Sequence, residues 1–446
     1  MRDIILTIVV FGILPFAIVS PHIGLLLWSW LGYMNPHRLT WGFAYSFPYV
    51  MIAAIVTMVA AVLGREKLKF PWSSVTVVWL LLVLWMCVTT MFALMPQLAQ
   101  VEWQRSMKIQ IMILMTLLIM GTKERLTQLV WVMAFSIGFF GIKGGVFTAV
   151  TGGNYRVWGP PGSFVEGNNE IALALLMVVP MLRFCQLQVQ SRWARHAFTA
   201  AMVLCAFSIV GSWSRGALLG GFTMCLYLWF KSRNRLAFGI PLILTAIVAV
   251  TFMPRAWTDR MGTIETYQQD QSALGRINAW WFAFHLANDR PVIGGGFQAF
   301  SDELFRKYAP NPDDVHDAHS IYFEMLGEQG YVGLGLFLTL WWLTMRAAGW
   351  VNRNVKGRPD LRWAADLVTM MQVGLVGYAS GGAFLGLSYF DLPYQMMSVV
   401  VLAKVIVRRE LARAAESGAS TPKAPVQRRS LLRPSRPIAA PKFVPR

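Results

Sequence analysis

Apolar runs of about 18 or more residues recur along this chain from one end to the other. An α-helix needs about 20 predominantly apolar residues to cross the hydrocarbon core of a bilayer. The composition agrees, because 56% of the 446 residues are hydrophobic, only 14% are charged and the mean hydropathy is +0.49. A soluble chain carries about 25% charged residues. The sequence therefore predicts an all-α polytopic membrane protein.

The apolar runs predict about twelve transmembrane helices. The N-terminal stretch up to Met34 is interrupted by Pro15 and by Pro21 after Ser20, and proline removes a helical hydrogen bond. We expect this stretch to cross the membrane once, as two half-helices. The other expected crossings centre on residues 45–63, 74–92, 107–120, 127–149, 168–183, 197–211, 215–230, 236–253, 320–345, 364–386 and 390–407.

The formal net charge of +18 is concentrated in the C-terminal tail and in short loops. From Lys404 to Arg446 there are eleven Lys and Arg against only Glu410 and Glu416. Short cytoplasmic loops of membrane proteins carry an excess of Lys and Arg. The pattern predicts both termini in the cytoplasm and favours membrane topology over nucleic-acid binding. Counting sides back from the tail brings further basic connections to the same face, at residues 65–69, 123–125, 183–196, 231–235 and 346–362.

The same alternation of sides leaves one long connection on the outer face. It spans residues 254–318 and is the only outer segment long enough to form a covering subdomain. The tail is rich in Pro, Arg, Ala and Ser, so we expect it to be disordered and either to contact anionic lipid headgroups or only to anchor the topology. The predicted parts are an N-terminal transmembrane bundle (1–253), the outer loop subdomain (254–318), C-terminal transmembrane helices (319–409) and a basic cytoplasmic tail (410–446).

Arg215 lies between two apolar segments on the outer face, where the topology rule disfavours a cation. It is either an arginine that snorkels to the headgroups or one that holds a phosphate in the fork of its guanidinium. The neighbouring Ser214 and Gly216 allow a ligand to approach closely. We therefore favour the phosphate-binding interpretation.

Two other outer arginines are candidates for binding an anion. Arg276 begins an aromatic-rich stretch, and it fits an anion site and a salt bridge to Asp270 or Asp289 equally well. Arg156 lies in a loop shaped by glycine and proline, where an arginine without a ligand is the simpler interpretation.

His319 falls where the outer excursion re-enters the membrane, in the first turn of a long predicted helix. The positive end of the helix dipole disfavours an imidazolium, so it keeps the imidazole in the neutral form that a general base requires. The alternative is a histidine that only caps the helix or rests in the interface. Spacing alone leaves both interpretations open.

Other groups of residues in the sequence do not support a metal site, a disulfide or a transport function. The spacing His-x-x-His with nearby carboxylates is common, so we do not infer a metal site from Asp313, Asp314, His316, Asp317 and His319. Cysteine spacing indicates neither a disulfide nor zinc, and no Walker-type loop supports ATP-driven transport. A transporter would place ionisable residues near the bilayer midplane, and the candidates are few: Lys108, Lys143, Glu324 and Asp366.

Taken together, these residues resemble the bacterial O-antigen ligase and polymerase superfamily, particularly the O-antigen ligases and the putative O-glycosylation ligases. The resemblance rests on four features in this order: Ser-Arg-Gly at 214–216, Gly-Arg followed by Trp at 275–280, the long outer loop, and His-Ser-x-Tyr-x-x-x-Leu-Gly-Glu-x-Gly at 319–330. The last pattern is the most specific.

The resemblance implies about twelve helices with a large periplasmic loop between late helices, in the bacterial inner membrane. It implies a glycosyltransferase of O-antigen ligase type, with a periplasmic active site and neither metal nor other cofactor. The donor would be a glycan on undecaprenyl pyrophosphate, and the acceptor the lipid A core oligosaccharide or, in the relatives, a protein hydroxyl or another glycan. His319, Arg215 and Arg276 match the family's essential residues, and Arg156 matches by loop position alone. O-antigen polymerase, protein O-oligosaccharyltransferase and glycolipid transporter remain the alternatives.

Overall fold

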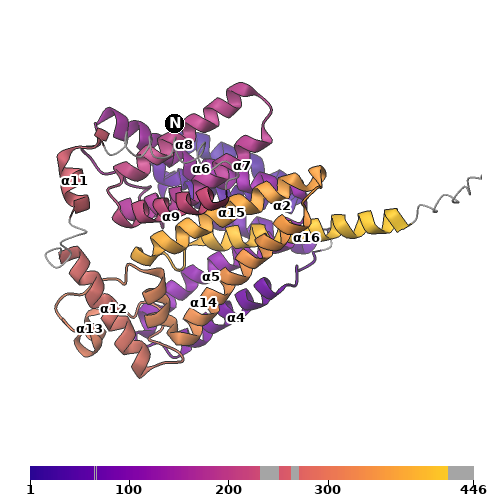
Figure 1. Ribbon diagram of the computed structural model, residues 1–446. Helices are drawn as coiled ribbons and strands as arrows, with labels where there is room; N and C mark the ends of the chain where they lie inside the picture. Colours follow the sequence, from indigo (N-terminus) through magenta and orange to yellow (C-terminus); the bar gives the residue numbers. More distant parts are fainter. Residues whose placement is uncertain (65, 67, 232–250, 263–270, 420–446) are drawn as a thin grey trace, which may run out of the picture. The chain divides into compact units, whose positions relative to one another are not determined.

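The protein folds into a bundle of helices, shown in a computed structural model that describes residues 1–64, 66, 68–231, 251–262 and 271–419 (Figure 1). The described residues form helices and loops, without strands. One compact unit covers Met1–Val407. The α-helices are α1 (Arg2–Val19), α2 (Pro21–Met34), α3 (Tyr49–Leu63), α4 (Ser74–Met91), α5 (Pro96–Ile119), α6 (Lys123–Val150), α7 (Asn168–Gln188), α8 (Arg192–Gly211), α9 (Arg215–Lys231), α11 (Arg255–Gly262), α12 (Gln271–Asp289), α13 (Asp302–Tyr308), α14 (Ile321–Asn354), α15 (Arg362–Gly381) and α16 (Asp391–Ala419). Short 3-10 turns lie at η1 (Pro36–Leu39), η2 (Phe43–Tyr45), η4 (Pro359–Leu361) and η5 (Gly382–Phe384).

Seven helical segments in the described ranges are long and apolar enough to cross a membrane. They confirm a multi-pass membrane protein. The count of twelve crossings stays a prediction, and the expected crossing at 236–253 falls largely outside the described residues. The seven are α1, α4, α6, α7, α8, α14 and the segment Pro359–Phe384, and the apolar helix α3 is shorter.

Helix α7 lies at the centre of the bundle. It packs against α6, α8, α9 and α15, and most of its side chains are buried. Its first turn carries Glu170, an acidic residue that the positive end of the helix dipole favours. The central helix therefore begins with a carboxylate at the end of the bundle where the outer loops gather.

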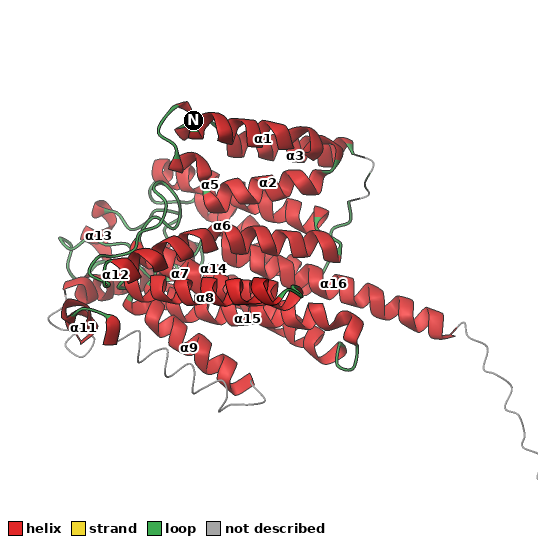
Figure 2. Ribbon diagram, turned by 90° about the horizontal axis from the view of Figure 1, so that it is seen from above, coloured by secondary structure: helices red, strands yellow, loops and turns green. Residues whose placement is uncertain are grey.

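The N-terminal stretch forms a helical hairpin. Pro15 is accommodated inside α1, and the chain reverses at Ser20, whose backbone is extended. The Asp3 carboxylate accepts hydrogen bonds from the backbone N–H groups of Gly42 and Ala44, so the start of α1 lies beside the loop that follows α2 (Figure 2). The expectation of one crossing by two half-helices is wrong, because a proline removes one hydrogen bond without ending a helix whose other bonds persist.

The segments predicted to share the outer face meet at one end of the bundle, here called the loop-rich end. The Arg290 guanidinium donates to the carbonyl of Phe92 at 2.7 Å, and the Val157 N–H donates to the carbonyl of Gly211 at 3.0 Å. Figure 1 shows α11, α12 and α13 gathered at one end of the bundle.

Basic connections meet at the other end. Arg125 binds the Glu66 carboxylate, and the Lys123 ammonium lies 5.5 Å from the centroid of the Trp363 ring. These contacts join three of the connections that the charge pattern placed together. The sorting of loops into two groups agrees with the sequence, and the assignment of one group to the cytoplasm stays a prediction.

The start of α1 lies at the loop-rich end, because Asp3 binds the 42–44 loop and Arg38 of the same connection packs on Gly162. The expectation that the N-terminus shares the face of the basic connections is therefore wrong.

Helix α14 is interrupted at Gly330, which has a φ of 68°. Such an interruption leaves backbone carbonyls without their helical partners, and these must be satisfied elsewhere. The Gly295 and Gly296 N–H groups donate to the carbonyls of Gly327 and Glu328, each at 2.8 Å, and the Trp85 indole donates to the carbonyl of Gln329 at 2.9 Å. The Gly-Glu-x-Gly pattern thus binds the loop that precedes α13 through backbone hydrogen bonds at the interruption of α14.

Replacing Gly330 by alanine should destabilise the fold by about 1–3 kcal/mol, because a side chain is strained at positive φ. An added Cβ would also meet the Val292 carbonyl oxygen. The control is Gly335→Ala on the same helix, where a Cβ has open space and should be neutral or slightly stabilising. The thermal unfolding midpoint of each purified variant measures the effect, and equal midpoints would contradict it.

Candidate active site

The loop that carries His319 is anchored to helix α12. The Trp280 indole N–H donates to the carbonyl of Ala318 at 2.8 Å. The Trp280 ring stacks on Phe323 of α14, with centroids 5.0 Å apart and ring planes inclined by 8°. Arg276 lies one helical turn before Trp280, so both side chains lie on the same side of α12. The Gly-Arg-to-Trp motif therefore fixes the His319 loop and places a guanidinium beside it.

His319 has an unusual backbone conformation. Its φ is 42°, in the left-handed region that non-glycine residues seldom adopt. Residues held in this region cluster at functional sites, where surrounding structure compensates for the strain. The side chain is half-buried, and the next residue, Ser320, precedes the first turn of α14.

His319 lines a cavity of about 270 Å³, here called the His319 cavity. Its walls come from α5, the 163–164 loop, α7, the 298–300 segment, α14 and the 386–390 segment. The lining is strongly acidic, with Arg105 as its one cation among the described residues. The carboxylates are Glu102, Glu170, Asp317, Glu324 and Glu328.

Two of these carboxylates are held by the segment before α16. Glu324 accepts hydrogen bonds from the Ser388 hydroxyl at 2.7 Å and from the Ser388 N–H at 3.2 Å. Glu328 accepts from the Tyr389 hydroxyl at 2.7 Å and from the Gln298 N–H at 2.7 Å. Fixed acceptors of this kind suit the hydroxyl groups of a sugar.

The surroundings of His319 favour the neutral imidazole. Burial lowers the pKa of His319 below its ordinary value of 6.5, and the Arg276 guanidinium lowers it further. Asp317 acts in the opposite direction, and His316 adds a smaller lowering. Arg276 also interacts electrostatically with Glu170 at the start of α7. The structure thus places Arg276 close enough to both His319 and Glu170 to interact electrostatically with each.

Arg215 begins helix α9 at the same end of the bundle. The neighbouring Gly216 approaches Phe384 of η5 closely, since an added Cβ would lie 3.1 Å from the Phe384 Cβ. The Phe384 ring lies 6.1 Å from that of Trp280. The first turn of α9 and the anchor of the His319 loop therefore flank the same residue, Phe384.

Arg156 lies on an exposed loop that packs against the turn before Arg215. Its guanidinium is 5.7 Å from the centroid of the Trp213 ring, and the Trp213 indole donates to the carbonyl of Gly153 at 3.2 Å. Trp213 has a φ of 62°. The loop thus supports the strained turn, and Arg156 does not line the His319 cavity as the described residues define it.

Comparison with known families divides the chain into two parts. Residues 1–182 match a family of unknown function. Residues 200–338 match the O-antigen ligase family. We call residues 200–338 the O-antigen ligase domain, after the family that they match. The resemblance to the O-antigen ligase and polymerase superfamily is thereby confirmed. No curated protein matches the chain.

The O-antigen ligase domain contains Arg215, Arg276 and His319, and the His319 cavity is completed from outside it. Sequence reasoning missed Glu102, Arg105 and Glu170, which lie within the part that matches the family of unknown function. Glu102 and Arg105 share one face of α5 and lie 3.7 Å apart. A carboxylate and a guanidinium near the polar start of an apolar helix are the signal that could have found this pair.

The two neighbouring histidines of the O-antigen ligase domain have different surroundings. His316 Nε2 lies 2.8 Å from an Asp314 carboxylate oxygen, and its ring packs on Gly275 of α12. His319 instead lines the cavity. The described residues contain no group of three or more His, Cys, Asp or Glu side chains placed to hold a metal.

Replacing Arg276 by glutamine should raise the pKa of His319, because it removes a positive charge that disfavours the imidazolium. In the unchanged protein, burial and the Arg276 guanidinium lower the pKa of His319, which favours the neutral imidazole; the protonated form grows as the pH falls. The reaction of His319 with diethyl pyrocarbonate requires neutral imidazole, and mass spectrometry can follow it at this residue. The pH at which the rate is half-maximal should be higher in Arg276→Gln than in the unchanged protein. It should not change in Arg306→Gln, which alters an exposed arginine. The same midpoint pH in the unchanged protein and both variants would contradict the placement of Arg276 beside His319.

Proposed function

We propose that the protein is an O-antigen ligase that transfers a polysaccharide from undecaprenyl pyrophosphate to the lipid A core oligosaccharide. The reaction would take place on the periplasmic side of the inner membrane, with inversion at the anomeric carbon and without a metal. The match of residues 200–338 supports glycosyl transfer of the O-antigen ligase or polymerase type. The observation that carries the proposal is a strained histidine beside Arg276 in a cavity lined by carboxylates.

His319 would act as the general base. The acceptor hydroxyl attacks the anomeric carbon from the face opposite the leaving group, and its proton moves to the imidazole as the new C–O bond forms. A base must be unprotonated before the step, and the surroundings of His319 disfavour its protonated form. The proton then leaves to water when the product departs.

The arginines would stabilise the leaving group. The bond from the anomeric carbon to the phosphate oxygen breaks, its electron pair stays on the diphosphate, and the developing charge requires fixed cations. Arg276 and Arg215 flank the Trp280–Phe384 contact, and guanidinium groups match phosphate oxygens in pairs. Because the cavity is acidic, we place the sugars within it and the diphosphate outside it, on the arginine side.

His319→Ala should reduce glycan transfer by about 10²–10⁴-fold, the usual contribution of a general base. The assay supplies purified protein with the lipid-linked donor and lipid A core and measures capped product. His196→Ala, an exposed histidine on α8, is the control and should transfer normally. Normal transfer by well-folded His319→Ala would refute the assignment.

Arg215→Gln and Arg276→Gln should each lower the rate constant of transfer by about 10²–10³-fold, as removal of one well-placed charge donor does. Lysine at either position keeps the charge and loses the paired hydrogen bonds, so we expect partial recovery. Arg306→Gln serves again as the control. Rates within twofold of the unchanged protein would exclude the arginines from leaving-group stabilisation.

The alternative functions are O-antigen polymerase and protein O-oligosaccharyltransferase, because the family match covers the reaction type rather than the acceptor. Supplying one donor with lipid A core, a polymeric glycan and a protein acceptor in parallel separates the three. Transfer to lipid A core supports the ligase, whereas transfer only to glycan or protein identifies the alternative. Movement of glycan across the membrane without bond exchange would instead indicate a transporter.

A further inference from the structure

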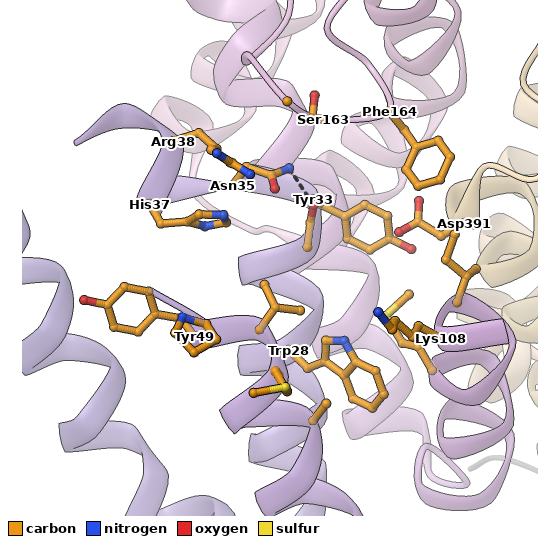
Figure 3. Close-up of a pocket in the computed structure, with 18 of the residues that line it drawn as sticks. Trp28, Tyr33, Asn35, His37, Arg38, Tyr49, Lys108, Ser163, Phe164 and Asp391 are labelled. Carbon is orange, nitrogen blue, oxygen red and sulfur yellow. Dashed lines mark hydrogen bonds between the residues drawn. The ribbon is translucent and has the colours of Figure 1, made fainter. Parts of the chain in front are cut away.

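A second and larger cavity is lined mainly by the part of the chain that matches a family of unknown function. Its volume is about 580 Å³, within the range of about 300–1,000 Å³ typical of ligand sites. It lies between α2, α3 and α5 and is closed by the 162–165 loop and by the start of α16 (Figure 3). We call it the α3–α5 cavity.

One side of the α3–α5 cavity is apolar and open. Met51 and Ile55 of α3 and Ile111 of α5 line it and are 57%, 48% and 41% exposed. Helix α3 is apolar, and Ile111 begins the apolar half of α5, so such side chains in a membrane bundle face lipid. The opening between α3 and α5 therefore gives a hydrocarbon chain lateral access from the bilayer.

The lining also contains polar and mainly cationic side chains. They are Arg38, Arg105 and Lys108, together with Asp391. The Arg38 guanidinium lies 4.7 Å from the centroid of the Tyr45 ring. Long cationic side chains in the lining of a largely apolar cavity match a lipid that bears phosphate.

Three polar atoms of the lining are buried and make no hydrogen bond within the described part of the chain. They are the Tyr33 hydroxyl, His37 Nδ1 and Asp391 Oδ1. Tyr33 is only 3% exposed, and Figure 3 shows its ring reaching toward Asp391. Buried polar groups are costly without partners. A ligand with hydroxyl groups would supply partners for both a donor and an acceptor.

The α3–α5 cavity and the His319 cavity share a wall. Arg105, Ser163, Phe164 and Phe390 line both cavities. The Arg105 guanidinium lies 3.6 Å above the centroid of the Phe164 ring, and the Phe164 and Phe390 rings are 6.1 Å apart. A molecule held in the larger cavity therefore ends beside the chamber that contains His319.

We infer that the α3–α5 cavity binds the acceptor, a glycolipid that carries phosphate and free hydroxyl groups. Its hydrocarbon chain enters between α3 and α5, and its head group meets Arg38, Tyr33 and Asp391 next to the shared wall. The inference rests on the proposed function, in which two lipid-linked substrates meet at His319. Because Arg215 and Arg276 of the O-antigen ligase domain take the donor diphosphate in that proposal, the cavity outside the domain takes the second substrate.

The test compares three variants of the cavity with one control in lipid nanodiscs. Arg38→Gln removes a cation, Tyr33→Phe removes a buried hydroxyl, and Ala54→Phe fills part of the cavity. The control is Val59→Phe, on α3 and 49% exposed but outside the lining. Native mass spectrometry measures binding of lipid A core, undecaprenyl pyrophosphate and phosphatidylglycerol to each, and transfer assays give KM for both substrates.

We expect Arg38→Gln to weaken binding of lipid A core, and to raise its KM, by about 10-fold or more, the effect of losing one hydrogen bond to a charged group. Donor KM should stay within about twofold, since the donor lies elsewhere. Tyr33→Phe should also weaken the binding of lipid A core. It should leave the unfolding midpoint unchanged or higher, because an unpartnered hydroxyl contributes no stability. Ala54→Phe should weaken the binding of lipid A core, and Val59→Phe should leave that binding unchanged.

The inference is overturned if the variants weaken the binding of undecaprenyl pyrophosphate instead of that of lipid A core. It is also overturned if phosphatidylglycerol competes equally with lipid A core, or if no variant changes the binding of lipid A core. If the cavity variants weaken lipid A core binding but the protein transfers glycan to no acceptor, the proposed function alone is refuted. If the protein transfers glycan efficiently and the cavity variants do not change lipid A core binding, the inference alone is refuted.

Discussion

The hydrogen bond from the Trp280 indole to the Ala318 carbonyl is the contact on which the site depends. It ties the end of the outer loop to α12 at the point where His319 must adopt a left-handed backbone. The stack of Trp280 on Phe323 extends the tie to α14. Because Arg276 is one turn away on α12, the same anchor sets its place relative to the imidazole. Without it, the loop could relax toward an ordinary backbone conformation and His319 would turn away from the cavity.

The charges around His319 are divided into two groups with different chemical uses. Carboxylates line the chamber, and two of them are fixed by Ser388 and Tyr389. Arg276 on α12 lies beside His319 and outside the described lining, in which Arg105 is the one cation. A diphosphate and a sugar both carry oxygen, but one is anionic and the other neutral, so the two groups separate them by charge. This division supports a reaction in which the sugar is retained while the diphosphate departs.

The helices and the sorting of loops into two groups were predictable from the sequence, because apolar length and charge are local properties. Arg215, Arg276 and His319 were singled out for the same reason. Their mutual placement was not predictable, since it depends on how α12 and α14 pack. Glu102 and Arg105 escaped notice because they belong to a distant segment that only the fold brings to His319. At the N-terminus the prolines predicted interrupted helices, whereas α1 continues through Pro15 and its packing against α2 outweighs the lost hydrogen bond.

The break at Gly330 makes two distant stretches inseparable. The loop at 291–296 supplies the partners for carbonyls of Gly327 and Glu328, and the Tyr331 N–H donates back to Pro291 at 2.9 Å. Neither stretch satisfies its backbone alone. In a chimera between relatives, residues 291–296 and 327–331 would have to come from the same parent, and a crossover placed between them would leave peptide groups stranded in an apolar setting.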